Sequence, residues 1–502
     1  MSRLIKNTSI IAGATLLSRI LGFLRDVVIA YFLGTSAMAD VFFVAFRVPN
    51  LLRRLFAEGS LTMAFVPIFK NLQIKEGEDS AFCFARSTFY WLLFVLSIIT
   101  IFAIIFAPYI TSLIAPGFKN RPDVFNFTTK LIRICFPYII FISAVALCMG
   151  ILNSLGHFAS PALAPCILNI VLIASGYIAY VKKINISLAL SYGVLLAGIL
   201  QFLMQQPVLK KFNFSWFGKI DLKHKGLKLL VKLMLPSVFG AAVYQLNIVL
   251  NTILASYLES GSVSYLYYAD RLVQFPLGIF GVAVSVAALP DLSNLAAQKD
   301  ITKFKQTLNQ SLYLILFICL PATAGLIGLS TPIIKLLFYR GAFNEYSVHA
   351  TSLCLIAYGL GLPAFSLVRT LVSSFYALKD TKTPAIIASI CLIVNLVSGV
   401  LLMKGLKYFG LALAVSISSW VNVLLLSYLL FKKIGQWIQI QKKLFIFNIL
   451  SLFIYLSCLK LSSLNTLSIL SIPLIGVLYL FICSQMGIEE AMFILRFLKK
   501  TK

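Results

Sequence analysis

The segment from residue 46 to 69 reads FRVPNLLRRLFAEGSLTMAFVPIF and carries charged side chains inside an otherwise apolar stretch. Three of them are arginines, Arg47, Arg53 and Arg54, and one is an acid, Glu58. An arginine at the centre of a membrane-spanning helix costs roughly 2.5–3.5 kcal/mol even on the lenient insertion scale. A guanidinium group at this depth therefore needs a partner, which is either an acid of the protein or an anionic ligand.

The first two apolar segments of the chain contain more arginines than acids. The residues are Arg19, Arg25, Asp26, Asp40, Arg47, Arg53, Arg54 and Glu58. One interpretation is that these charges pair with one another and lock helices together, as Arg54 and Glu58 could at a spacing of four residues, or that they lie near the interfaces and extend to water, as Arg47 could. Three acids cannot neutralise five guanidinium groups, however, and the exclusive use of arginine favours planar, bidentate binding of phosphate. The excess favours an anionic, phosphorylated ligand in a hydrated cavity.

The composition indicates the setting of these charges. Of the 502 residues, 60% are apolar and 12% charged, the mean hydropathy is +0.95, and apolar blocks of about 20 residues recur along the chain. This pattern predicts an all-α polytopic membrane protein. The net charge of +27 lies mainly in short links between the blocks, which is typical of topology signals and argues against nucleic acid as a partner. The nine cysteines include no C-x-x-C pair and the three histidines are far apart, so neither a metal site nor a cofactor is expected.

The apolar blocks predict fourteen membrane-spanning segments. Their limits are 8–33, 38–69, 82–114, 126–153, 160–180, 187–209, 229–257, 263–296, 307–337, 346–376, 383–403, 409–431, 444–463 and 467–495. The long polar link 210–228 contains six lysines and separates two halves of six segments. The predicted domains are therefore an N-terminal lobe (1–209), a basic linker (210–228), a C-terminal lobe (229–431) and two additional helices (432–502).

Short motifs recur in the same order in both halves. VPIFKNL (66–72) resembles LPDLSNL (289–295), and AFR (45–47) resembles ADR (269–271) at nearly the same offset, about 224 residues. SPALAPCILNI (160–170) is similar to TPAIIASICLIVNL (383–396). Because each half has an even number of segments, the repeat predicts two pseudo-symmetric lobes related by an axis along the membrane normal, with a cavity between them.

Lysine and arginine are distributed unequally between the two sides of the predicted topology. The links on the side of the N-terminus carry 23 of these residues and the opposite links carry 7. Because basic links remain in the cytoplasm, the asymmetry predicts that both termini and the link 210–228 are cytoplasmic.

Motifs of common membrane enzymes are absent from the sequence. It has no G-x-x-x-x-G-K-[ST] motif for ATP hydrolysis. A membrane glycosyltransferase needs acids close together near a membrane surface, whereas the outer links offer single acids such as Asp123, Glu259 and Glu345. The acids at 76–79 lie in a predicted cytoplasmic loop. An enzyme is therefore not expected.

Three long stretches resemble the MurJ (MviN) family of lipid II flippases, in the multidrug/oligosaccharidyl-lipid/polysaccharide exporter superfamily. The stretches are SRILGFLRDVVIAYFLG, ADVFFVAFRVPNLLRRLFAEGSLTMAFVPIF and YYADRLVQFPLGIFGVAVSVAALP. The resemblance implies two six-helix lobes and two final helices that form a lipid-facing groove. The residues that the family needs in its cavity correspond to Arg19, Arg25, Asp40, Arg53, Glu58 and Arg271. Asn50, Arg54 and Asp26 lie in the same motifs.

The function implied by this resemblance is lipid translocation in the bacterial inner membrane. Undecaprenyl-pyrophosphate-linked disaccharide-pentapeptide would move from the cytoplasmic to the periplasmic leaflet, with Arg19, Arg25, Arg53 and Arg271 holding the pyrophosphate. Two alternatives stay open, a flippase for another lipid-linked oligosaccharide and a scaffold of the cell-wall synthesis machinery that does not transport. A drug exporter should have more acids than bases in its cavity, which is the opposite of the pattern here.

The residues do not identify a driving force. Some family members bind sodium through an acid in the seventh segment, where this chain has only Gln245, Asn247 and Asn251. Coupling to another ion or to the membrane potential is left open, as is a requirement for protein partners from cell-wall synthesis.

Overall fold

The computed structural model describes residues 2–54, 60–435, 442–462 and 471–492 and the single residues 469 and 495, without the side chains of 2–8, 236–244, 280 and 442. The described backbone is helical, with short connections, and has no strand. It forms two compact units. The first comprises Met1–Ser264 with Arg340–Phe343, and the second comprises Tyr265–Tyr339 with Asn344–Lys502.

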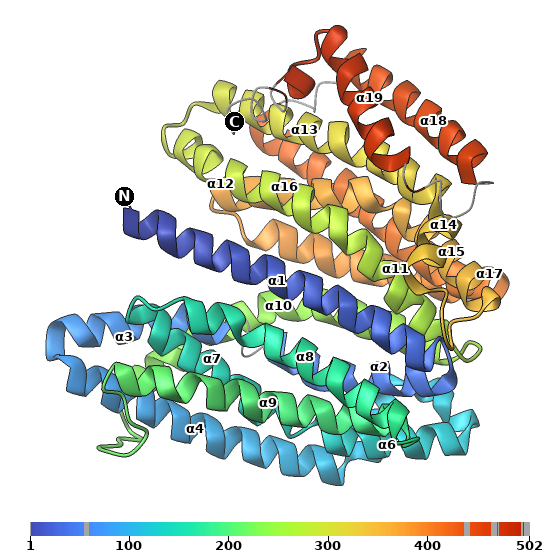
Figure 1. Cartoon of the computed structure of the whole chain (residues 1–502). Coiled ribbons are helices and arrows are strands. Elements are labelled where there is room, and N and C mark those ends of the chain that lie inside the picture. Colours follow the sequence, from blue (N-terminus) through green and yellow to red (C-terminus); the bar gives the residue numbers. More distant parts are fainter. Residues whose placement is uncertain are drawn as a thin grey trace. The chain divides into compact units, whose positions relative to one another are not determined.

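The first unit is a helical bundle (Figure 1). Its elements are α1 (Ser2–Leu33), α2 (Ala37–Leu52), α3 (Thr62–Glu76), α4 (Glu78–Ile105), α5 (Ala107–Ile114), the 3₁₀ turn η2 (Pro116–Asn120), α6 (Pro122–Cys135), α7 (Tyr138–Ser154), α8 (Ala159–Val181), α9 (Ile186–Lys211) and α10 (Lys225–Ser256). Helix α8 packs against α1 and α9. Gly193 on α9 permits the close approach of α9 to α8, because a Cβ at residue 193 would lie 2.5 Å from Ser175 Oγ on α8.

The second unit is also helical. Its elements are α11 (Ser262–Pro276, of which the first three residues belong to the first unit), the π-helical turn η3 (Leu277–Gly281), α12 (Val282–Ala297), α13 (Ile301–Gly328), α14 (Ser330–Phe338), α15 (Glu345–Gly359), α16 (Leu362–Ala377), α17 (Lys382–Ile434), α18 (Lys442–Ser462) and α19 (Ser471–Gln485). Buried aliphatic and aromatic side chains of α12, α13, α16 and α17 form its main core. Helix α18 packs on α13.

The predicted segments agree with these helices. In its described part, each of the fourteen contains one helix or two consecutive helices, and residues 55–59 and parts of the last two segments lie outside the described residues. Breaks lie where regular helix is difficult to continue, as at Pro137 between α6 and α7. The segments 383–403 and 409–431 correspond to the two helical parts of α17, which are separated by a kink at Lys407 (φ 46°, ψ −131°). In the described chain, eight helices are long and apolar enough to cross a membrane, or nine if α15 and α16, which meet at a bend of 40°, count as one.

The polytopic all-α architecture with two related halves is confirmed. A detail of the backbone supports the repeat independently. Residues 53, 54, 60 and 61 are π-helical, and so is Leu277–Gly281. At the offset of the repeated motifs, about 223 residues, the π-helical Arg54 corresponds to Leu277, where the π-helical turn of the second half begins. Both halves therefore depart from regular helix at an equivalent place. Because π-helical turns are rare and occur frequently at functional sites, this shared departure supports the repeat.

The compact units and the predicted domains divide the chain at different places. The boundary between units lies at 264/265 and leaves α10 in the first unit, whereas the sequence repeat begins anew after the link 210–228. The first boundary reflects packing and the second reflects the sequence repeat. The four predicted domains, including the two final helices as a lipid-facing groove, stay a prediction.

Candidate functional site

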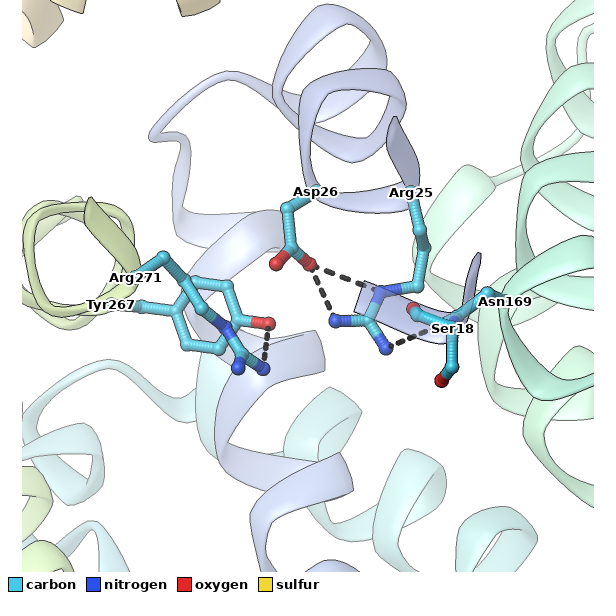
Figure 2. A network of polar contacts seen from close by, with 6 residues as sticks. All are labelled: Ser18, Arg25, Asp26, Asn169, Tyr267 and Arg271. Atoms are coloured by element: carbon cyan, nitrogen blue, oxygen red, sulfur yellow. Dashed lines mark hydrogen bonds and ion pairs between the residues drawn. The ribbon is translucent and has the colours of Figure 1, made fainter. Parts of the chain in front are cut away.

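Arg25 lies in a buried polar cluster on α1 (Figure 2). Its Nε and Nη2 donate hydrogen bonds to Oδ1 of Asp26 at 3.0 and 2.6 Å, and Nη1 donates to Oδ1 of Asn169 on α8 at 3.1 Å. Asn169 Nδ2 in turn donates to the backbone oxygen of Ser18 at 3.1 Å. The side chains of Arg25 and Asp26 are only 8% and 3% exposed. The guanidinium group is therefore held in place by an acid and an amide.

The Arg25–Asp26 pair joins adjacent residues, which normally point in different directions on a helix. The length of the arginine side chain allows it to fold back onto the neighbouring carboxylate. A buried ion pair of this kind contributes little net stability, but removal of one partner typically costs about 3–5 kcal/mol because the other charge stays buried. The geometry thus keeps the desolvated guanidinium group of Arg25 in a fixed position while Asp26 balances its charge.

The other arginines of the first two segments have different environments. Arg19, on the same helix as Arg25, is exposed. Arg53 donates from Nε and Nη2 to Oδ1 of Asn50, at 3.0 and 2.9 Å, and Arg54 beside it is half-buried. Both lie in the π-helical stretch that follows α2. Glu58 lies outside the described residues, and so does its predicted pairing with Arg54.

Asp40 is buried and its carboxylate accepts hydrogen bonds from a distant segment of the first unit. Oδ2 accepts from the backbone nitrogen of Gly261 at 2.6 Å, and Oδ1 accepts from the nitrogen and Oγ of Ser264 at 2.9 and 2.6 Å. These donors lie at the start of α11, so the carboxylate satisfies backbone groups that a helix leaves unpaired at its N-terminus. In this conformation Asp40 supports the backbone.

Arg271 lies on α11 in the second unit and contacts the tyrosine one helical turn earlier. Its Nη2 donates to Tyr267 OH at 3.0 Å, and its guanidinium carbon lies 4.9 Å from the centre of the Tyr267 ring (Figure 2). Cation–π contact and hydrogen bonding to the same residue orient the side chain.

The structure also identifies two polar residues that were not predicted from the sequence, Asn169 and Arg369. Asn169 is part of the motif SPALAPCILNI, which indicated the repeat but gave no sign that its amide binds Arg25. Arg369 on α16 is a half-buried arginine inside a predicted membrane segment. The signal for Arg369 was the same as for the first two segments, namely an arginine surrounded by apolar residues.

The first unit also contains a cavity of about 400 Å³ whose lining is almost entirely apolar. Its walls include Leu51, Phe102, Phe106 and Val249, and Arg47 is the one charged residue among the described lining. Arg47 Nη1 donates hydrogen bonds to Thr252 Oγ1 and to the backbone oxygen of Ile248. An apolar cavity of this kind suits hydrocarbon and does not suit a pyrophosphate.

Comparison with known proteins gives the family. The sequence profile described as lipid II flippase MurJ matches residues 29–482. The chain belongs to the MurJ lipid II flippase family. A probable lipid II flippase MurJ of Buchnera aphidicola subsp. Acyrthosiphon pisum is 35% identical over 491 residues, which cover 95% of this chain and 96% of the relative. The corresponding protein of Haemophilus influenzae is 38% identical over 425 residues, covering 82% and 83%.

Solved structures support the MurJ assignment at the level of the fold. A lipid II flippase MurJ in an inward closed conformation superimposes with a TM-score of 0.81 at 30% identity, over 96% of this chain and 99% of that one. An inward-facing multidrug resistance MATE transporter of the MOP superfamily gives 0.69 at 16% identity, over 83% and 94%. The second likeness shows a shared fold alone. The chain is thus a multi-pass inner-membrane protein of the MurJ family.

Proposed function

We propose that this chain translocates lipid II, the undecaprenyl-pyrophosphate-linked disaccharide-pentapeptide, from the cytoplasmic to the periplasmic leaflet by alternating access. The observation that carries the proposal is the match to lipid II flippases over nearly the whole chain. A flippase moves its substrate without changing covalent bonds, so the protein acts as a transporter and not as an enzyme. Both termini and the link 210–228 lie in the cytoplasm in this proposal.

The pyrophosphate is the part of the substrate that the membrane interior disfavours most, because it must lose water while it carries charge. Arg19, Arg25, Arg53 and Arg271 replace that water with guanidinium groups. Asn50, Arg54, Glu58 and Asp40 complete the proposed site, with Asp40 acting through the backbone that it holds. The lipid tail remains among the bilayer lipids.

Arg25 binds by exchange of partners. One carboxylate oxygen of Asp26, Oδ1, accepts two hydrogen bonds from Arg25, and a phosphate group can accept the same two bonds, either through one oxygen or bidentately through two. The pyrophosphate therefore takes the place of the Asp26 carboxylate while Asn169 keeps the guanidinium plane oriented. Return of Asp26 to Arg25 then favours release of the substrate.

The test separates this role from a structural one. We expect Arg25→Ala and Asp26→Ala each to lower membrane abundance, because each leaves one buried charge without its partner. The double variant Arg25→Ala, Asp26→Ala should recover abundance and should still fail to complement a strain depleted of the protein. The leaflet that holds the lipid-linked precursor is measured in parallel, and the precursor should accumulate on the cytoplasmic side.

Growth of the depleted strain with the double variant at normal abundance would contradict the proposed role of Arg25. Loss of growth with unchanged distribution of the precursor between leaflets would instead favour a scaffold that does not transport. If the protein fails to move this precursor but moves a different lipid-linked oligosaccharide, the proposed substrate is wrong and the second lipid is the substrate.

A further inference from the structure

The link between α9 and α10 is folded against α4 within the first unit. Arg86 on α4 donates from Nε to the backbone oxygen of Ser215 at 2.9 Å and from Nη1 to that of Lys219 at 3.0 Å. The backbone nitrogen of Asp221 donates to Ser87 Oγ at 2.8 Å. Two adjacent residues of one helix thus fix the path of the link with three hydrogen bonds, two donated by Arg86 and one accepted by Ser87.

Trp216 shows how deeply this link returns along the bundle. Its indole nitrogen donates to Gln206 Oε1 at 2.6 Å, and its ring lies 4.2 Å from that of Phe89 and 6.1 Å from that of Phe202, centre to centre. Phe202 precedes the end of α9 at Lys211 by nine residues, or about 13 Å at 1.5 Å per residue. The link therefore runs back towards the membrane after it leaves the helix.

Gly218 permits this fold-back. Its φ of +146° is rare for residues with a side chain, and a Cβ at this position would lie 2.5 Å from Arg86 Nη1. The guanidinium group can bind the link on both sides of residue 218 because no side chain stands between them. The glycine at the turn therefore leaves the space that the Arg86 guanidinium group occupies.

The outer surface of the link combines apolar and basic side chains. Phe217 is 85% exposed, Leu222 60% and Ile220 42%, and Lys219 and Lys223 between and beside them are exposed too. Over 210–228 the sequence contains six lysines and a single acid, Asp221. Large apolar side chains interspersed with lysines are typical of segments that lie in a membrane interface and meet anionic headgroups.

We propose that this link, defined as residues 212–224, is an interfacial anchor that binds anionic phospholipid. Phe217, Ile220 and Leu222 enter the region between headgroups and acyl chains, and Lys219 and Lys223 contact the phosphates. Trp216 packs between residues of α4 and α9 and so places the link close to the membrane, and the link has an excess of positive charge. Both features favour anionic lipid over a protein as its binding partner. The proposal rests on the membrane setting and cytoplasmic placement of the link, and it is independent of the substrate that the protein moves.

The depth of Phe217 in a bilayer tests the proposal. A nitroxide label is attached to Phe217→Cys in the full-length protein, which is feasible because all nine native cysteines are buried. The protein is reconstituted in nanodiscs of phosphatidylcholine alone or of equal parts phosphatidylcholine and phosphatidylglycerol. Collisions of the label with oxygen, which enters the bilayer, and with a water-soluble nickel chelate give its depth. Lys75→Cys, on the exposed end of α3, is the matched control.

We expect the label at 217 to be shielded from the nickel chelate in anionic nanodiscs, while the label at 75 stays accessible. Replacing Lys219 and Lys223 by glutamine should weaken partitioning of the labelled link about fivefold for each lysine, which corresponds to ~1 kcal/mol each. Equal accessibility of both labels to the chelate would overturn the proposal. Shielding that does not depend on phosphatidylglycerol or on the lysines would overturn it too, as would shielding that appears only when another protein is added. The nanodisc has two equivalent faces, so failure here is distinct from failure of the proposed topology.

Discussion

Asn169 is the residue that ties the Arg25 guanidinium group to a second helix. It accepts from Arg25 and donates to Ser18, so its amide uses both of its ends within the first unit. Its side chain is buried, and Gly22 on α1 lies against it without a side chain of its own. The amide therefore determines the direction of the guanidinium plane, whereas Asp26 balances the charge.

We expect Asn169→Ala to reduce transport more than it reduces membrane abundance. The substitution leaves one nitrogen of Arg25 without its acceptor and allows the plane to rotate, at a cost of about 1–3 kcal/mol for an unsatisfied buried group. Complementation of a depleted strain, compared with protein level, measures the difference. Asn120→Ala, at an exposed position at the end of η2, is the control and should resemble the wild type. Unimpaired growth with Asn169→Ala would contradict the role of the amide.

At this scale the sequence predicted which residues are unusual but not what they touch. Arginines inside apolar segments were recognisable from their cost alone. Asp40 bonds to residues more than 220 positions later, and Arg25 bonds to an asparagine 144 positions later. Such contacts depend on how helices pack, and a single sequence contains no pairing information at that range. The adjacency of Arg25 and Asp26 was visible, but helix geometry alone argues against their contact.

Among the elements, the start of α11 depends on a carboxylate from α2. We expect Asp40→Ala to lower the thermal midpoint of the purified protein, because three donors at residues 261 and 264 lose their acceptor, at a cost of about 2 kcal/mol. Asp40→Asn keeps one oxygen and should lose less. Asp123→Ala removes an exposed acid in the first turn of α6 and should be nearly neutral. Equal midpoints for the three variants would contradict the capping role.

The link between α16 and α17 provides a pH-dependent contact. Asp380 accepts from Lys433 Nζ and from the backbone nitrogen of Thr383, and these bonds hold the pKa of its carboxyl well below the ordinary value. A carboxyl whose pKa is lowered by folding stabilises the fold above its ordinary pKa and loses that contribution as the pH falls further. We expect the unfolding midpoint of the wild type to fall between about pH 4 and about pH 2 more steeply than that of Asp380→Asn. Parallel curves would contradict the contribution of Asp380.

Element positions were predicted well because apolar length is a strong signal in membrane helices. The breaks were harder to predict. Pro137 and the lysines at 404 and 407 gave visible signals, but the π-helical turn at Leu277–Gly281 contains no unusual residue type apart from its glycines. Such a turn results from packing around it, so only the structure locates it and its counterpart after α2.

At the scale of the whole molecule, the charge of the links predicts the orientation. The links on the side of the N-terminus carry 23 lysines and arginines against 7 on the other side, and each misplaced link would oppose the positive-inside rule. Fusions of truncated chains to a reporter that is active only in the periplasm measure this. A fusion after Lys225 should be inactive, whereas fusions after Lys119 and after Lys183 should be active. Because six segments precede Lys225, activity there would require either an odd number of crossings or an inverted orientation, and inactivity after Lys119 and Lys183 would identify the inverted orientation.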